Sequence, residues 1–446
     1  MAGKTLFTVV FAIYAAVASA AALEPRQKLR GHWVDLWATM PQLVEPHNMP
    51  NAPFNQTNVV FQNSTLRQTI QLSLPAKTLR LRFSNAFANT DVKIDAVTIA
   101  FPPTNAAGGK EIRPETVKSV TFDEGSSSIT IAKGALAVSD PVNFEITKAQ
   151  TVVAITIYFK DGQTGGYQTG HPGSRTNSWM GFGNQVGSVN ITGPEAVSTA
   201  HWYYLSAVEA WLGEDKVSFA IVGDSITDGR GSTTDANNRQ VRYCSFWPDL
   251  LLTRLIKSKR TDIAIANQAA GGNRILADGL GPNALARIER DVIAHSGVNY
   301  VQIYIGVNDI GGAATDAATQ KLVGDRVINA YKQMITRIHA VGLPVFGTTI
   351  TPFCAPPANA SVQPYSDAER ERTRQRVNEW IRNSGRFDAV IDFDKFVRDP
   401  TNGTILKDEY NSGDYLHLSV AGYQRFADQF PVKLFDQFPD GVTRLV

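Results

Sequence analysis

The chain has 446 residues, 43% hydrophobic and 19% charged, and these proportions exclude an intrinsically disordered protein. Its 43 Lys and Arg residues are interspersed with 41 Asp and Glu residues, so the net charge is +2 and no nucleic-acid surface is predicted. The length favours two domains or one large one. With only Cys244 and Cys354, the fold does not depend on disulfides, and the sequence leaves open whether these two pair.

Residues 1–20 have the features of a secretory signal peptide. Lys4 precedes a short apolar run, LFTVVFAIYAAVA, and the small residues ASA at 18–20 supply a cleavage site. A signal anchor is the alternative, but no stop-transfer pattern follows. We therefore expect a secreted, extracellular protein without stable membrane insertion. Five Asn-x-Ser/Thr sequons agree with this: Asn55, Asn63, Asn190, Asn359 and Asn402.

Residues 28–205 are predicted to form an all-β, sandwich-like domain. Short segments rich in β-branched and aromatic residues often alternate with polar residues, and clusters of Gly, Pro, Asn and Asp separate them. Many short strands at such spacing favour an antiparallel sandwich. The clearest predicted strands cover 78–87, 92–101, 119–124, 127–134 and 151–159.

Residues 214–446 are predicted to form a doubly wound α/β domain. Continuous apolar runs alternate with long helical patterns, as expected for a parallel sheet covered on both faces. The helical pattern at 366–384 opens with a capping box, Ser366 and Glu369. The predicted strands cover 217–223, 262–269, 299–306, 343–350 and 388–394.

Four fragments of this second part combine small, acidic and polar residues. GDSITDG (223–229), NQAAGGN (267–273) and GVND (306–309) each follow a predicted strand, and DYLHLS (414–419) lies near the C-terminus. Because the carboxyl ends of parallel strands meet at one edge of a sheet, the first three fragments should converge there.

Ser225 is the candidate nucleophile, since it stands where a buried strand ends and a polar turn begins. A serine hydroxyl is a weak nucleophile until a base removes its proton, and His417 is the candidate base. Asp414 lies three residues earlier, and on a turn that spacing lets its carboxylate reach Nδ1 and stabilise the imidazolium. The alternative is that Ser225 caps a helix and His417 is an ordinary surface histidine.

Acyl transfer also needs donors for the negative oxygen that develops on the carbonyl group. The backbone N–H groups of Ser225 and Gly272 and the side-chain amide of Asn308 are the candidates for this oxyanion hole. Each such donor typically contributes about 3 kcal/mol of transition-state stabilisation, so three donors are sufficient for an oxyanion hole that supports acyl transfer.

The order of these four fragments resembles the SGNH (GDSL) hydrolases, over about residues 216–432. The resemblance implies a three-layer α/β/α fold and an ester hydrolase. The additional β-rich half is similar, more loosely, to a secreted subgroup grouped with xylan- and other polysaccharide-deacetylating esterases. The family's four functional residues correspond to Ser225, Gly272, Asn308 and His417, with Asp414 orienting the histidine.

The second fragment departs from the family pattern, which commonly reads Asn-x-Gly-x-x-Gly. Here Ala269 occupies the third position, and Gly271 and Gly272 are adjacent. Spacing from Asn267 favours Gly272 as the oxyanion donor, while Gly271 remains the alternative donor.

Other chemistries lack a motif in this chain. There is no G-x-S-x-G, H-E-x-x-H, G-x-G-x-x-G or Walker A pattern, which argues against α/β-hydrolase, metalloprotease and nucleotide-binding readings. Asp224, Asp228 and Asp309 are interpreted as groups that hold loops, so no metal and no cofactor is predicted. Among the other histidines, His171 stands out because its polar loop, GHPGSRTNSW, is able to rim a site, although a structural role is favoured.

We therefore predict a secreted serine esterase that removes short acyl groups, most simply acetyl from a plant or microbial polysaccharide. Polar loops at 229–244 and 351–366 should form the rim and favour a carbohydrate ester. A lipase or phospholipase is the alternative. A carbohydrate-binding protein, with Trp33, Trp37 and Trp179 as platforms, is a non-enzymatic one, although packing is the simpler role for these tryptophans. The sequence leaves the oligomeric state open.

Overall fold

The structure, a computed structural model, describes residues 30–232 and 246–442. The predicted signal peptide and Cys244 lie outside these ranges, and Cys354 is a half-buried free thiol. Within the described ranges, no helix has the length and apolarity required to cross a membrane.

The N-terminal part is an antiparallel β region, as predicted. One sheet has the order β1-β19-β6-β11, with β12 also on β6, and a second has the order β17-β16-β5-β13-β8-β9. Both sheets contribute apolar side chains to one core, since successive side chains of a strand point to opposite faces of its sheet. The strands are β1 (His32–Ala38), β5 (Ser64–Leu72), β6 (Ala76–Ser84), β8 (Ala96–Ala100), β9 (Lys118–Val120), β11 (Leu136–Val138), β12 (Val142–Ile146), β13 (Thr151–Phe159), β16 (Ser178–Phe182), β17 (Val197–Thr199) and β19 (Leu205–Leu212).

Three smaller antiparallel sheets extend this β region. The one that matters for the site has the order β18-β15-β2, and it fixes two segments that are far apart in sequence. The short strands are β2 (Gln42–Leu43), β3 (Asn55–Gln56), β4 (Val59–Val60), β7 (Val92–Ile94), β10 (Ile129–Ile131), β14 (Gln163–Thr164), β15 (Thr169–His171) and β18 (Trp202–Tyr203), and η1 (Pro46–Asn48), η2 (Pro114–Thr116) and η3 (Pro172–Ser174) are short 3-10 turns.

The C-terminal part is a five-stranded parallel sheet with the order β21-β20-β22-β23-β24, which confirms the predicted α/β class. The inner strand β20, which lies between β21 and β22, is buried along almost its whole length, as its apolar sequence VSFAIVG requires. The strands are β20 (Val217–Gly223), β21 (Ile263–Ala269), β22 (Val298–Tyr304), β23 (Val345–Thr348) and β24 (Ala389–Ile391).

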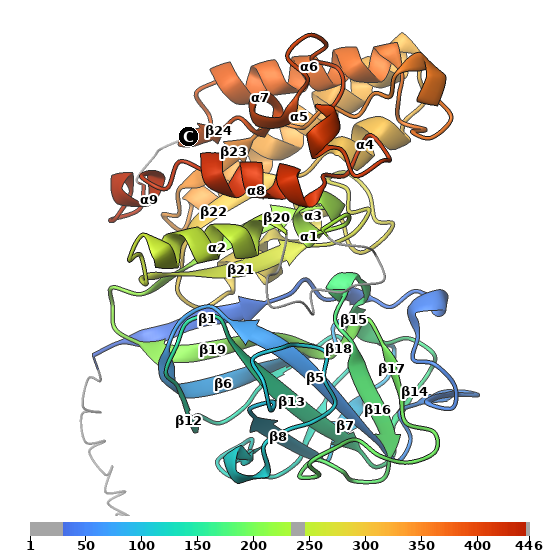
Figure 1. Cartoon of the computed structure of the whole chain (residues 1–446), viewed down its shortest axis with the longest axis vertical. Coiled ribbons are helices and arrows are strands. Elements are labelled where there is room, and N and C mark those ends of the chain that lie inside the picture. Colours follow the sequence, from blue (N-terminus) through green and yellow to red (C-terminus); the bar gives the residue numbers. More distant parts are fainter. Residues whose placement is uncertain (1–29, 233–245, 443–446) are drawn as a thin grey trace, which may run out of the picture. The chain divides into compact units, whose positions relative to one another are not determined.

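The helices of this part form two packed groups. Helix α2 lies beside α8, and α5 packs against both α3 and α6 (Figure 1). They are α1 (Ser225–Asp228), α2 (Trp247–Lys257), α3 (Ala284–Ile288), the π-helical η4 (Glu289–Ile293), α4 (Val307–Gly312), α5 (Ala317–His339), α6 (Ala368–Asn383), α7 (Phe393–Val397), α8 (Val420–Gln429) and α9 (Leu434–Gln437), with 3-10 turns η5 (Pro357–Asn359) and η6 (Asp408–Tyr410).

The predicted capping box at the start of α6 is wrong. The N-cap is Asp367, whose carboxylate accepts the backbone N–H groups of Glu369 and Arg370. A carboxylate satisfies two orphan N–H groups and also suits the positive end of the helix dipole. The Ser366 hydroxyl is used elsewhere and accepts the N–H of Ala355.

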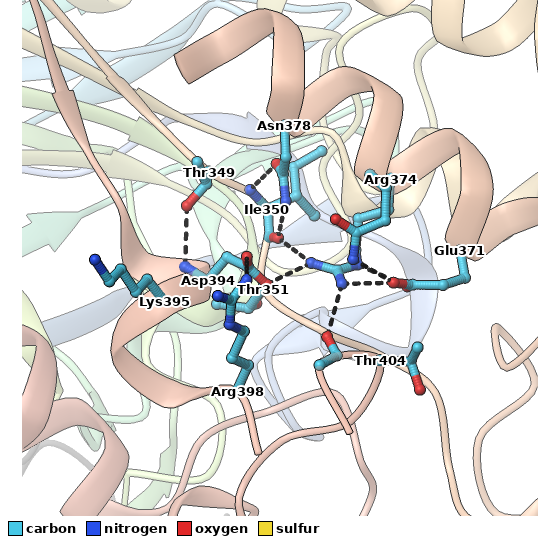
Figure 2. A network of polar contacts seen from close by, with 12 residues as sticks. Thr349, Ile350, Thr351, Glu371, Arg374, Asn378, Asp394, Lys395, Arg398 and Thr404 are labelled. Atoms are coloured by element: carbon cyan, nitrogen blue, oxygen red, sulfur yellow. Dashed lines mark hydrogen bonds and ion pairs between the residues drawn. The ribbon is translucent and has the colours of Figure 1, made fainter. Parts of the chain in front are cut away.

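A buried ion network anchors the loop that follows β23. Figure 2 shows the Arg374 guanidinium, fully buried, between the carboxylates of Glu371 and Asp394. Two further bonds, to the carbonyl oxygens of Ile350 and Gly403, complete its five donors. Because every donor is satisfied, this network fixes the start of the predicted rim loop.

Candidate active site

Ser225 lies at the first position of α1, directly beyond the carboxyl end of β20. Asp224 caps the turn by accepting the N–H of Ile226 at 3.0 Å, and this leaves the Ser225 N–H without a partner among the described residues. Burial, helped by the nearby charges of Asp309 and Asp228, raises the pKa of Asp224 to about 7 even though the Ile226 N–H opposes the shift. The turn therefore holds the Ser225 hydroxyl at the end of the sheet.

The loop before α8 brings His417 to Ser225. The distance from Ser225 Oγ to His417 Nε2 is 2.7 Å, and that from His417 Nδ1 to Asp414 Oδ2 is 2.6 Å. Asp414 also accepts the N–H groups of Leu416 and His417, so one turn fixes both side chains.

The ionisation of Asp414 decides which nitrogen of His417 carries the proton. Burial alone raises the pKa of Asp414, but its hydrogen bond and charge interaction with His417, with two backbone N–H groups, outweigh burial and hold that pKa well below its usual range. An ionised carboxylate only accepts, so Nδ1–H must be the donor. His417 Nε2 is then left to accept the Ser225 hydroxyl proton.

Asn308, on α4, presents its amide to the same site in a fixed orientation. Its Nδ2 donates to the Asn273 carbonyl oxygen at 3.0 Å, and its Oδ1 accepts the Tyr365 hydroxyl at 3.1 Å. One N–H of the amide remains for a ligand. The N–H groups of Gly271 and Gly272 likewise have no partner among the described residues, and Gly272 has the left-handed backbone (φ +68°) that favours glycine.

Of the three acidic residues that were interpreted as groups that hold loops, Asp224 and Asp309 do so, as predicted. Asp224 caps α1, and Asp309 accepts the N–H groups of Ile275 and Leu276 at 2.8 and 2.9 Å, which ties α4 to the loop after β21. In the described parts of the chain, no group of three or more His, Cys, Asp or Glu side chains is arranged to hold a metal ion.

Residues 221–425, which contain all of these groups, match the model of the GDSL-like lipase/acylhydrolase family. The chain carries a GDSL-like acylhydrolase domain. It is therefore an ester hydrolase of the SGNH type, preceded by an antiparallel β region. No curated protein matches the chain.

Solved structures similar to the GDSL-like domain cover about half of this chain. A GDSL-like lipase from Bacteroides thetaiotaomicron is 15% identical over 50% of this chain and 90% of its own, with a TM-score of 0.36. A variant of an acetyl xylan esterase from Geobacillus stearothermophilus is 19% identical over 52% and 100%, with a TM-score of 0.35. A carbohydrate acetylesterase from Sinorhizobium meliloti is 14% identical over 50% and 100%, with a TM-score of 0.36.

The third acidic residue, Asp228, connects the GDSL-like domain to the β region. His171 Nε2 lies 3.0 Å from Asp228 Oδ1, while His171 Nδ1 lies 3.0 Å from the Met40 carbonyl oxygen. Arg175 donates to the backbone oxygen of Asp228, also at 3.0 Å. Since Asp228 is the last residue of α1, these hydrogen bonds connect the β region to the helical turn that carries Ser225. His171 thus has the structural role that the sequence favoured.

Gly173 makes this contact possible. A Cβ on Gly173 would lie 2.0 Å from Oδ2 of Asp228, so only glycine allows η3 to approach the carboxylate this closely.

A cleft of about 620 Å³ contains Ser225, Asn308 and His417 in its lining. The predicted rim loops contribute Arg230 and residues 362–365, whereas residues 233–244 lie outside the described residues. The β region supplies a further wall of the cleft. One part comes from the loop GHPGSRTNSW, which the sequence indicated as able to rim a site, and the other comes from residues 42–48, which carry no motif and were not predicted. That wall consists of Gln42, Glu45, His47 and Asn48 from one segment and Pro172, Gly173 and Arg175 from another.

The tryptophans considered as sugar platforms are mainly packing residues. Trp37 is 9% exposed and meets Trp202 edge to face. Trp33 packs against Trp211 and lies under the Arg80 guanidinium. Trp179 is half-buried, and its indole N–H donates to the Gly108 carbonyl oxygen.

Proposed function

We propose that Ser225 is the nucleophile of this ester hydrolase, His417 its general base and Asp414 the group that orients the histidine. The observation that supports this best is the continuous hydrogen-bonded chain of these three side chains, with distances of 2.7 and 2.6 Å. Such a chain is the arrangement that serine acyl transfer requires.

The reaction follows from this geometry. Nε2 of His417 takes the Ser225 proton while Oγ attacks the ester carbonyl, and the same proton then passes to the departing alcohol oxygen. The acyl-enzyme is released when water attacks, giving one proton to His417, which returns it to Ser225. The backbone N–H groups of Ser225 and Gly272 and the Asn308 amide stabilise the oxyanion in both steps.

The proposed substrate is a short-chain ester, most simply an acetyl group on a polysaccharide. The polar groups of the cleft wall, with Glu45, Asn48 and Arg175 among them, suit a hydroxylated alcohol portion.

A second candidate is an ester with a longer acyl chain, as in a lipid. Leu280 and Val362 both line the cleft, and they are unusually exposed for large apolar side chains, at 48% and 49%. Such side chains give an acyl chain apolar surface to contact.

The test compares wild type with Ser225→Ala on 4-nitrophenyl esters from acetate to octanoate and on acetylated xylan. We expect the highest kcat/KM for acetate, acetate release from xylan, and loss of both in Ser225→Ala. Equal activity in the variant would overturn the role of Ser225. A maximum at octanoate without acetate release would replace the polysaccharide substrate by a lipid.

We also propose that the protein is secreted after cleavage near residue 20. The support is the charged, apolar and small-residue pattern of residues 1–20, together with the exposure of the sequon residues Asn55, Asn63 and Asn402. N-terminal sequencing of the protein from a culture medium tests this, and a retained Lys4 would contradict it.

A further inference from the structure

The β region contributes a carboxylate to the cleft whose role the serine chemistry leaves unexplained. Glu45 is half-buried and lines the same cleft as Ser225. No Lys or Arg of the described residues forms an ion pair with it, and the hydrolysis mechanism above does not use it. An acidic group in that position is therefore available to a ligand.

Glu45 is held in place by its neighbours. Its Oε1 accepts Nε2 of Gln42 at 2.7 Å, and its Oε2 accepts Nδ2 of Asn48 at 2.9 Å. Gln42 is itself only 4% exposed, so its amide is a fixed support. Each carboxylate oxygen thus uses one of its acceptor sites and keeps another.

The backbone of this segment is also fixed. Gln42 and Leu43 pair with β15, the strand that ends at His171, and the Tyr203 hydroxyl donates to the Asn48 carbonyl oxygen at 2.9 Å. The segment from Gln42 to Asn48 is therefore preorganised, which lowers the entropy cost of binding at this wall.

The charges of the cleft indicate what kind of group fits beside Glu45. An anionic ligand would be repelled by Glu45, and a cationic one would meet Arg175 and Arg230 in the same lining. A neutral group with several hydroxyls suits both Glu45 and the two arginines, because hydroxyls donate to a carboxylate and accept from guanidinium or amide N–H groups.

We propose that Glu45 and Asn48, with the exposed His47 beside them, form a binding subsite for a neutral, hydroxyl-rich alcohol portion of the ester, such as a sugar unit. This inference rests on the proposed serine esterase function of the same cleft. It assigns the β region a direct part in substrate selection, and it makes Glu45 a specificity residue and not a catalytic one.

The experiment measures kcat/KM of wild type, Glu45→Gln and Glu45→Ala on two esters with the same acyl group. The alcohol portion of acetylated xylo-oligosaccharide carries free hydroxyl groups, whereas the 4-nitrophenyl group of 4-nitrophenyl acetate carries none. A hydrogen bond to a charged group is a strong one, so we expect kcat/KM for the oligosaccharide to fall about 10- to 100-fold in Glu45→Ala, less in Glu45→Gln. Turnover of 4-nitrophenyl acetate should be unchanged. Glu115→Gln, an exposed carboxylate of the β region outside the cleft lining, is the matched control.

Three results would overturn the subsite. The first is that neither Glu45 variant changes kcat/KM for the oligosaccharide. The second is an equal loss of activity on both substrates, which would indicate a structural role for Glu45. The third is that wild type cleaves 4-nitrophenyl acetate but not the oligosaccharide. Failure of the serine mechanism gives a different result, because 4-nitrophenyl acetate turnover would then survive in Ser225→Ala.

Discussion

Replacing Gly173 by alanine tests whether the β region positions the nucleophile turn. The added methyl group would lie 2.0 Å from Oδ2 of Asp228, whereas ordinary contact begins at 3.4 Å, so the two must separate by about 1.4 Å. Asp228 is fully buried and already engaged by His171, so its carboxylate has little room to turn aside. The strain must therefore move η3 or α1.

The consequence for catalysis follows from the position of Asp228 in the same helical turn as Ser225. A displacement of about 1 Å at reacting groups can cost about 100-fold in rate. We expect kcat to fall about 10- to 100-fold with a smaller change in KM, and the free energy of unfolding to fall by about 1–3 kcal/mol through overpacking.

The assay combines steady-state kinetics on 4-nitrophenyl acetate with urea unfolding. Gly187→Ala is the matched control, since a Cβ there meets nothing within 4 Å. A variant at Gly173 that loses stability but keeps the wild-type kcat would refute the idea that this contact positions Ser225. If neither quantity changes, the contact itself is not as close as described.

Two further predictions concern the acidic residues of the site. Asp414→Asn should lower kcat about 10³- to 10⁴-fold, because an amide that donates to Nδ1 leaves an N–H, and not a lone pair, facing Ser225. Kinetics on 4-nitrophenyl acetate test this, and a loss below tenfold would contradict the assigned tautomer. Asp224→Asn should keep the helix cap and remove the pH dependence that the buried carboxyl group gives to the free energy of unfolding. Because the pKa of Asp224 is raised from 3.8 to about 7 in the folded protein, wild type loses stability as the pH rises between these two values. The stability difference in favour of the variant should therefore grow from pH 4 to 7 and level off above, as measured by urea unfolding. A difference independent of pH would show that Asp224 is ionised throughout.

Much of the GDSL-like domain could be predicted from local patterns. Five apolar runs gave the five parallel strands, and β20 has the predicted bounds, because a strand buried on both faces must be continuously apolar. The start of α6 was missed by one residue, since Ser366 and Asp367 are both good caps and only the surroundings decide which of them is used.

The sequence also allowed the proximity of Ser225 and His417, which lie 192 residues apart in the chain, to be predicted. Parallel strands deliver their carboxyl ends to one edge, and the Asp414–His417 pair is a local three-residue spacing. The order of the four fragments and the family resemblance supplied the remaining link.

The sequence by itself thus determined the fold class of both parts, and it predicted the residues of the proposed reaction. Only the tertiary structure decided that the β region contacts α1 through His171 and Gly173, and that Glu45 lines the cleft. The physical reason is that these contacts join short elements separated by 53 residues or more, where no periodicity or motif links the partners. Their meeting depends on the complementary shapes of two packed surfaces, and that complementarity exists only once both parts have folded.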